Sequence, residues 1–143
     1  MFNYYGKSSN QGGHINSYIY ENDNFLSRLF FIEKITFLNT EEAILDKITA
    51  DLFNPKINSY INVNDLSDEQ IFNFKNIKFS SESKIQLLAW EPDKIVFKTI
   101  SNSPQIVFLS EMYYPGWTIS NSDIININGL FRGIVVPEGE NEY

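Results

Sequence analysis

Short runs of apolar and polar residues, separated by turn-forming residues, dominate the second half of the chain. The clearest runs cover residues 84–90, 94–100 and 105–111, and each of the turns between them, at 91–93 and 102–104, contains a proline. Alternation with a period of two is typical of a strand with one buried face. Strands this short, separated by turn signals, predict an antiparallel β-sandwich.

A β-hairpin is predicted after this series. Residues 123–127 and 130–136 flank Asn128-Gly129, the strongest hairpin signal in the chain, because a type I′ turn needs φ > 0 at both central residues. Residues 137–139 predict another turn. A further strand is expected at 140–143, and we expect it to be missing, very short or supplied from elsewhere.

The first half of the chain carries weaker strand signals. Residues 1–14 are rich in Gly, Ser and Asn, a composition that favours a flexible loop. Ser67 is expected to cap a helical turn within the polar connection at 65–69. The predicted strands are 15–20, 29–32, 35–37, 57–62 and, with the weakest patterns, 71–74 and 77–79.

One helix is predicted, near residues 40–52. Asn39 and Glu42 have the three-residue spacing of a capping box, and acidic residues suit the positive end of the helix dipole. Asn54-Pro55 is expected to end the helix, because the residue before a proline avoids the α region. The apolar residues that predict one buried face are Ile44, Leu45, Ile48 and Leu52.

Together these elements predict a mainly β fold. We expect an antiparallel β-sandwich of jelly-roll or immunoglobulin-like type, with one flanking α-helix near residues 40–52. The length of 143 residues fits one domain with a substantial core. The expected organisation is a flexible N-terminal segment, residues 1–14, followed by a single sandwich domain, residues 15–143.

Composition narrows the classes of partner and chemistry. Eighteen acidic residues against 11 basic ones give a net charge of −7, which argues against a nucleic-acid partner and against docking on anionic lipid. Cysteine is absent and His14 is the only histidine, so we expect neither a metal site nor a cofactor. The apolar runs are too short to span a bilayer, and no signal peptide follows Met1. These features predict either a cytoplasmic domain or a fragment whose targeting segment lies upstream.

The densest aromatic group lies at residues 111–117, around Pro115-Gly116, a dipeptide that suits a tight turn between strands at 105–110 and 117–119. Two interpretations of this corner stay open. Its rings could stack on a sugar, with Asn128 among the side chains that offer hydrogen bonds. Alternatively, the rings and Phe131 are a buried corner, with Arg132 pairing with Glu111 or capping carbonyl groups. The candidate ligand-binding residues are Tyr113, Tyr114, Trp117, Arg132 and Glu111.

Carboxylates cluster at Glu138, Glu140 and Glu142. A carboxylate pair performs acid–base catalysis only where the fold sets the spacing of the two groups. We interpret the three as a solvated turn, and a small hydrolase that uses them with Arg132 is a less favoured hypothesis. The sequence contains no nucleophile elbow and no glycine-rich phosphate loop, so no catalytic residue is predicted.

Several segments, in order, resemble the C-terminal region of the bacterial YfhO-like membrane proteins. Residues 19–28, with Tyr-Glu-Asn, and residues 40–55, a helix followed by Phe-Asn-Pro, are similar to two segments of that family. The most specific segments are 109–117, with Tyr-Pro-Gly-Trp, and 128–139, with Asn-Gly-Leu-Phe-Arg-Gly and Val-Pro-Glu-Gly. The resemblance covers about residues 15–140.

Members of that family are polytopic membrane proteins that resemble GT-C glycosyltransferases, which use lipid-linked sugar donors and modify cell-envelope polymers. The resemblance implies that this chain is their soluble β-rich tail, or a free-standing relative, on the extracytoplasmic face of a bacterial membrane. Its implied partners are the transmembrane bundle of the parent protein and an envelope glycan. No catalytic residue is carried over. Asp23 and Ser27 replace prolines of the family, and its final strand is cut short after Tyr143.

From the resemblance and the aromatic corner we expect a non-catalytic accessory domain. It would hold or present a cell-envelope glycan, or brace the membrane bundle. The alternative is a stand-alone carbohydrate-binding or adhesion module.

Overall fold

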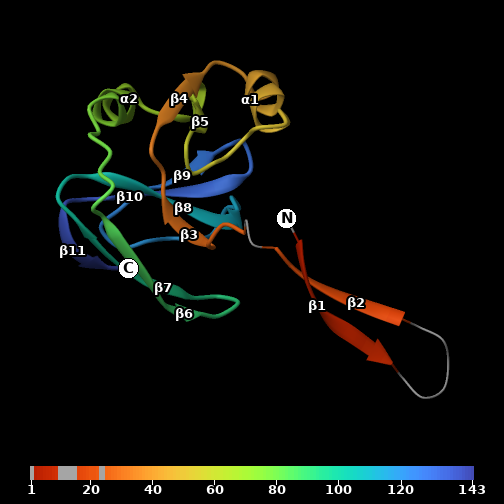
Figure 1. The fold of residues 1–143 in the computed structure, drawn as a ribbon. Coiled ribbons are helices and arrows are strands. Elements are labelled where there is room, and N and C mark those ends of the chain that lie inside the picture. Colours follow the sequence, from red (N-terminus) through yellow and green to blue (C-terminus); the bar gives the residue numbers. More distant parts are fainter. Residues whose placement is uncertain (1, 10–15, 23–24) are drawn as a thin grey trace.

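Two antiparallel sheets form a sandwich in the computed structural model, which describes residues 2–9, 16–22 and 25–143 (Figure 1). The four-stranded sheet has the order β3 (Leu29–Phe31), β8 (Gln105–Met112), β10 (Phe131–Val136) and β9 (Ile124–Ile127). The three-stranded sheet has the order β11 (Gly139–Glu142), β7 (Ile95–Ser101) and β6 (Lys84–Trp90). The predicted mainly β sandwich is confirmed, and its jelly-roll or immunoglobulin-like type stays a prediction.

Strand β8 lies in the interior and is covered on both faces. Its residues from Gln105 to Leu109 are all buried. Ile106 and Phe108 point to one side and Val107 and Leu109 to the other, because successive side chains of a strand alternate. A continuous apolar run is typical of a strand buried on both faces. The four-stranded sheet is therefore the middle of three layers.

Each face of this middle sheet has its own hydrophobic core. Towards the three-stranded sheet, the buried residues are Leu29, Phe97, Val107, Leu109, Ile134 and Val136. On the opposite face they are Phe30, Ile32, Ile61, Phe74, Ile106, Phe108, Ile125 and Ile127. In this second core the rings of Phe30 and Phe108 stack with centroids 4.7 Å apart.

The third layer contains a parallel pair of strands, which departs from the purely antiparallel prediction. Strand β4 (Ile35–Leu38) leads into helix α1 (Glu41–Ile48), and β5 (Ser59–Asn62) then pairs with β4 in parallel. Parallel neighbours need a crossover connection, and α1 provides it. Figure 1 shows α1, β4 and β5 above the middle sheet, beside helix α2 (Asp68–Lys75).

Helix α1 is the predicted helix, but it is shorter than expected and begins one residue later. Thr40, not Asn39, is the N-cap, and its side chain accepts a hydrogen bond from the backbone N–H of Ala43. The helix ends at Ile48, well before Pro55. Ile44 is its only buried residue, while Leu45 is exposed and Leu52, beyond the helix, is 96% exposed. The prediction that these apolar residues form one buried face was therefore wrong for Leu45 and Leu52.

Helix α2 replaces the weak strand predicted at 71–74. Ser67 caps it as expected, in a full capping box with Gln70: the Ser67 hydroxyl accepts from the Gln70 N–H, and the Gln70 side chain accepts from the Ser67 N–H. Phe74 is its one buried residue. The single turn expected at Ser67 thus continues as a helix, and residues 77–79 form no strand.

A hairpin of β1 (Phe2–Ser9) and β2 (Asn16–Asn22) lies apart from the sandwich in Figure 1. The strand predicted at 15–20 corresponds to β2, whereas β1 occupies part of the segment for which a loop was expected. Residues 10–14, with His14, lie outside the described residues. The division into a flexible segment and a domain from residue 15 stays a prediction.

The C-terminal elements match the sequence closely. Asn128 and Gly129 have φ values of 55° and 71°, as a type I′ hairpin turn requires. The last strand, expected to be missing, very short or supplied from elsewhere, is present as the short strand β11, which pairs with β7. Residues 117–119, expected as a strand, are part of a loop. Neither helix of the described part of the chain is long and apolar enough to cross a membrane.

Candidate functional site

The loop of residues 113–123 builds the candidate site. It joins β8 to β9, and both of these strands pair with β10, which lies between them. The loop crosses the face of β10 that is turned towards the three-stranded sheet, where Ile119 packs against the core. Gly116 has φ = 107°, so the Pro115-Gly116 turn forms as predicted. The turn bends the loop but does not join two neighbouring strands.

Arg132 lies beneath this loop and is only 4% exposed. Arg132 shares one face of β10 with Ile134 and Val136, because every second side chain of a strand points the same way. Its side chain therefore starts on the face between the two sheets. Its Nε donates a hydrogen bond to the Met112 carbonyl oxygen over 2.8 Å. Its guanidinium carbon lies 4.3 Å from the centre of the Trp117 ring, a cation–π contact. Its Nη1 is buried and has no hydrogen-bond partner among the described residues.

Glu111, the predicted ion-pair partner of Arg132, lies near it but pairs with another arginine. Burial lowers the pKa of Arg132, while the negative charge of Glu111 raises it. The ion pair of Glu111 is with Arg28, at 3.7 Å between Arg28 Nη1 and Glu111 Oε1. Arg28 in turn lies over the Trp90 ring, 4.6 Å from its centre. Two structural roles were predicted for Arg132: pairing with Glu111 and capping a carbonyl group. The structure contains a hydrogen bond for the second, from Arg132 to the Met112 carbonyl.

A pocket of about 570 Å³ opens between the loop, β10 and the β6–β7 turn. Its apolar lining includes Trp117 and Ile119 from the loop and Phe97 from β7, and Arg132 contributes to its wall. Tyr143 also lines it; burial raises the pKa of this tyrosine, and its hydroxyl is buried without a hydrogen-bond partner among the described residues. The site is thus an apolar pocket whose wall includes two residues with unpaired polar groups.

The aromatic residues of the predicted corner divide into two groups. Tyr113 and Tyr114 are exposed, at 43% and 69%, so the interpretation of a wholly buried corner is wrong for both. Trp117 is half-buried at the pocket. Phe131 packs in the opposite core, with its ring centre 5.1 Å from that of Phe108, and is not part of the site.

Asn128, considered as a hydrogen-bonding group for a sugar, has a structural role instead. It is buried, and its Oδ1 accepts from the backbone N–H of Tyr60 over 2.7 Å. Its own N–H donates to the Tyr60 carbonyl over 2.8 Å. These two bonds attach β5 to the end of the β9–β10 hairpin. Because Oδ1 of Asn128 already accepts the Tyr60 N–H, it serves the fold and not a sugar.

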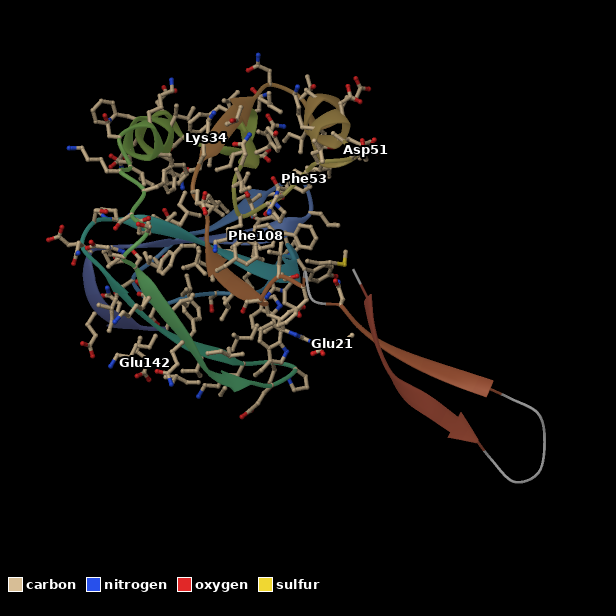
Figure 2. The ribbon with its side chains drawn as sticks, in the orientation of Figure 1. Glu21, Lys34, Asp51, Phe53, Phe108 and Glu142 are labelled. Carbon is tan, nitrogen blue, oxygen red and sulfur yellow. The ribbon has the colours of Figure 1, made fainter. Side chains whose placement is uncertain are left out.

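The three C-terminal glutamates do not converge on the pocket. Glu138, Glu140 and Glu142 are all exposed, and none of them lines it. Glu140 pairs with Lys98, and this hydrogen bond raises the pKa of the lysine. Figure 2 shows Glu142 at the molecular surface, near the C-terminus. Within the described residues no group of three potential metal ligands is close enough to hold an ion.

A second pocket, of about 590 Å³, lies between α2 and the end of β10. Gln70, Asn73 and Asn76 line one side and Asp123 the other, and Gln70 Nε2 donates to Asp123 Oδ2 over 3.3 Å. This pocket was not predicted, because residues 71–74 were interpreted as a strand. The helical spacing of the three amide side chains was the signal that could have revealed it.

No family model, curated protein or solved structure matches this chain.

Proposed function

We propose that the chain is a non-catalytic accessory domain of a GT-C-like membrane glycosyltransferase and that it holds or presents a cell-envelope glycan. In this proposal the domain lies on the extracytoplasmic face of a bacterial membrane, next to the transmembrane bundle of the parent protein. The glycan occupies the pocket beneath Trp117, with Tyr113 and Tyr114 exposed on the same loop. The family assignment rests on the resemblance of the sequence motifs.

The observation that carries the proposal is the pocket itself. A volume of about 570 Å³ lies within the usual range for small-ligand sites, which are mostly apolar with a few polar groups. A sugar presents both apolar C–H faces and hydroxyl groups. Trp117 offers a ring, while Thr118 and Ser120 offer hydroxyl groups along the same loop. The site therefore combines the two kinds of contact that a sugar ring needs.

The positions of the family-like motifs agree with this choice of site. The segments 109–117 and 128–139 carry the most specific part of the resemblance, and they meet here. Tyr113 donates its backbone N–H to the Leu130 carbonyl over 2.7 Å, and Arg132 donates to the Met112 carbonyl. Motifs that are separate in the sequence thus surround one site.

Calorimetric titration with soluble fragments of neutral and acidic envelope polysaccharides tests the proposal. Thr118→Trp should abolish binding, because Thr118 is an exposed residue of the pocket wall and a tryptophan would fill the space. Thr118→Ser is its matched control, because it keeps the hydroxyl group, and it should bind normally. Tyr114→Ala should weaken binding several-fold, whereas Phe72→Ala, an equally exposed ring on α2, should not. A full panel without binding, or unchanged binding in Thr118→Trp, would contradict the proposal.

Bracing of the membrane bundle is the second candidate, and a group of exposed apolar residues favours it. Met112, Tyr113 and Leu130 lie together at one end of the four-stranded sheet and are all at least 43% exposed. Apolar groups gathered at a surface commonly mark an interface. A stand-alone carbohydrate-binding or adhesion module would share the glycan contacts. An upstream reading frame with many apolar segments would favour the accessory domain over that module.

A further inference from the structure

Arg132 has a physical property that the proposed function does not by itself require: it is a buried cation with an unpaired donor. The residue is only 4% exposed. One of its nitrogens binds the Met112 carbonyl, and its charge lies over Trp117, but Nη1 has no partner among the described residues. A buried charged donor without an acceptor destabilises the folded state. A ligand that supplied an acceptor would remove that penalty.

The surroundings of the pocket have a different charge from the chain as a whole. Its wall carries two cations, Arg132 and Lys94, and one carboxylate, Asp93, although the chain has a net charge of −7. Glu111 lies near Arg132 but is paired with Arg28. The local excess of positive charge favours an anionic group inside the pocket.

We propose that the ligand of this pocket carries an acidic group, a carboxylate or a phosphate, on a compact ring. The acidic oxygen accepts a hydrogen bond from the Arg132 guanidinium, and the ring contacts Trp117 and Phe97. This inference rests on the proposed function and narrows its ligand to an acidic sugar. Guanidinium groups bind both kinds of oxyanion strongly, because the hydrogen bond is charge-assisted.

The lining of the pocket explains why a neutral sugar is the poorer ligand. Ile119, Phe97 and Ile134 provide an apolar wall, which lowers the local dielectric and strengthens a charge–charge contact. A neutral ligand would fill the same space and leave the charge of Arg132 without an anionic partner. The second pocket differs in kind: its polar lining is amides, one hydroxyl and one carboxylate, with no cation. The preference for an acidic ligand is therefore expected at the pocket beneath Trp117 and not at the second pocket.

Four probes distinguish the contribution of the acidic group to binding from that of the sugar ring. They are glucose, glucuronate, glucose 6-phosphate and benzoate, and each is titrated into the whole chain and followed by NMR. Glucuronate should bind about tenfold or more tightly than glucose, the difference that a charge-assisted hydrogen bond supplies. The comparison of glucuronate with glucose 6-phosphate shows which acidic group fits better. Raising the ionic strength should weaken the binding of both acids and leave glucose unchanged. Equal affinity for glucose and both acidic sugars would overturn the inference and leave the glycan function standing.

Variants of Arg132 test its role through the ratio of the affinities for glucuronate and glucose. A general loss of stability would not change this ratio. Arg132→Gln should abolish the preference for glucuronate over glucose, and Arg132→Lys should retain part of it. Circular dichroism first checks that these variants fold. If they do not, Lys94→Glu, an exposed change at the pocket wall, should reduce the preference about threefold. Lys84→Glu on β6 does not touch this pocket and is the matched control.

The probes also distinguish failure of this inference from failure of the proposed function. Binding of benzoate without any sugar would overturn the glycan function while supporting an anion contact at Arg132. Binding of glucuronate that survives unchanged in Arg132→Gln and Lys94→Glu would overturn the inference alone. Absence of binding by all four probes would overturn both.

Discussion

Arg132 and Asn128 are both buried polar residues, but their side chains are satisfied to different degrees. Asn128 accepts from Tyr60 through Oδ1 and lies 3.4 Å from Ser59 through Nδ2. Arg132 makes one hydrogen bond and keeps an unpaired donor. Buried polar groups are normally paired, so the bonds of Asn128 fit a structural role, whereas the unpaired Nη1 of Arg132 is a donor that a ligand could use.

Asn128→Ala tests the structural role. It removes the acceptor of the Tyr60 N–H and places an alanine, whose Cβ disfavours the left-handed region, at φ = 55°. We expect the free energy of unfolding to fall by about 2 to 4 kcal/mol, measured by urea denaturation. Asn128→Gly keeps the positive φ and loses only the side-chain bonds, so it should be less destabilising. Equal effects of the two variants would show that the turn conformation contributes little.

Residue-level predictions from the sequence succeeded where two adjacent residues determine the geometry. Asn128-Gly129 and Pro115-Gly116 both adopt the turns that their φ preferences favour. The burial of Arg132 was not predictable in this way. It depends on the register of β10 against β8 and on how the loop of residues 113–123 folds over β10.

At the scale of elements, helix α2 shows how local signals compete. Its segment contains Ile71 and Phe72 in a pattern that resembles a short strand, yet it forms a helix. The capping box between Ser67 and Gln70 and the burial of Phe74 favour the helix. The capping box and the packing of Phe74 in the core thus outweigh a weak alternation.

Ser67→Ala should destabilise α2 selectively. The variant loses the hydrogen bond to the Gln70 N–H, and loss of an N-cap costs about 1 kcal/mol. Hydrogen exchange should accelerate most at the backbone amides of α2, with little change in β8. Ser81→Ala, in an exposed loop, is the control and should stay within about 0.5 kcal/mol of the parent. Uniform acceleration across the chain would contradict a local role for the cap.

Strands were predicted better than their pairing. A strand was predicted at 105–111, where β8 forms, and β6 has the predicted bounds. The parallel pairing of β4 with β5 was missed, although a helix was predicted between two strand signals. Strand patterns in one sequence specify which side chains are buried, whereas pairing depends on contacts between distant segments.

The molecule as a whole is organised around β8, which contributes to both cores. Ile106 packs on the side of the helices and Leu109 on the side of the three-stranded sheet. Figure 2 shows Phe108 in the interior between the sheet and the layer above it. Because one strand supports both cores, we expect the sandwich and the helical layer to unfold together.

Ile106→Ala and Leu109→Ala test this coupling. Each removes a buried side chain from a different core, so each should reduce the free energy of unfolding by about 2 to 5 kcal/mol. Unfolding followed by far-ultraviolet circular dichroism and by tryptophan fluorescence should remain one coincident transition in both variants. Two separate transitions, with the helical layer lost first in Ile106→Ala, would show that the layers are independent.

The most direct test of the proposed ligand site is a ¹H–¹⁵N NMR titration of the whole chain with glucuronate. We predict that the signals of the Trp117 indole N–H and the Arg132 Nε–H shift together and saturate with one affinity. The side-chain amides of Gln70 and Asn73 in the second pocket should not move. Shifts confined to those amides, or no saturable shift at Trp117 and Arg132, would contradict it.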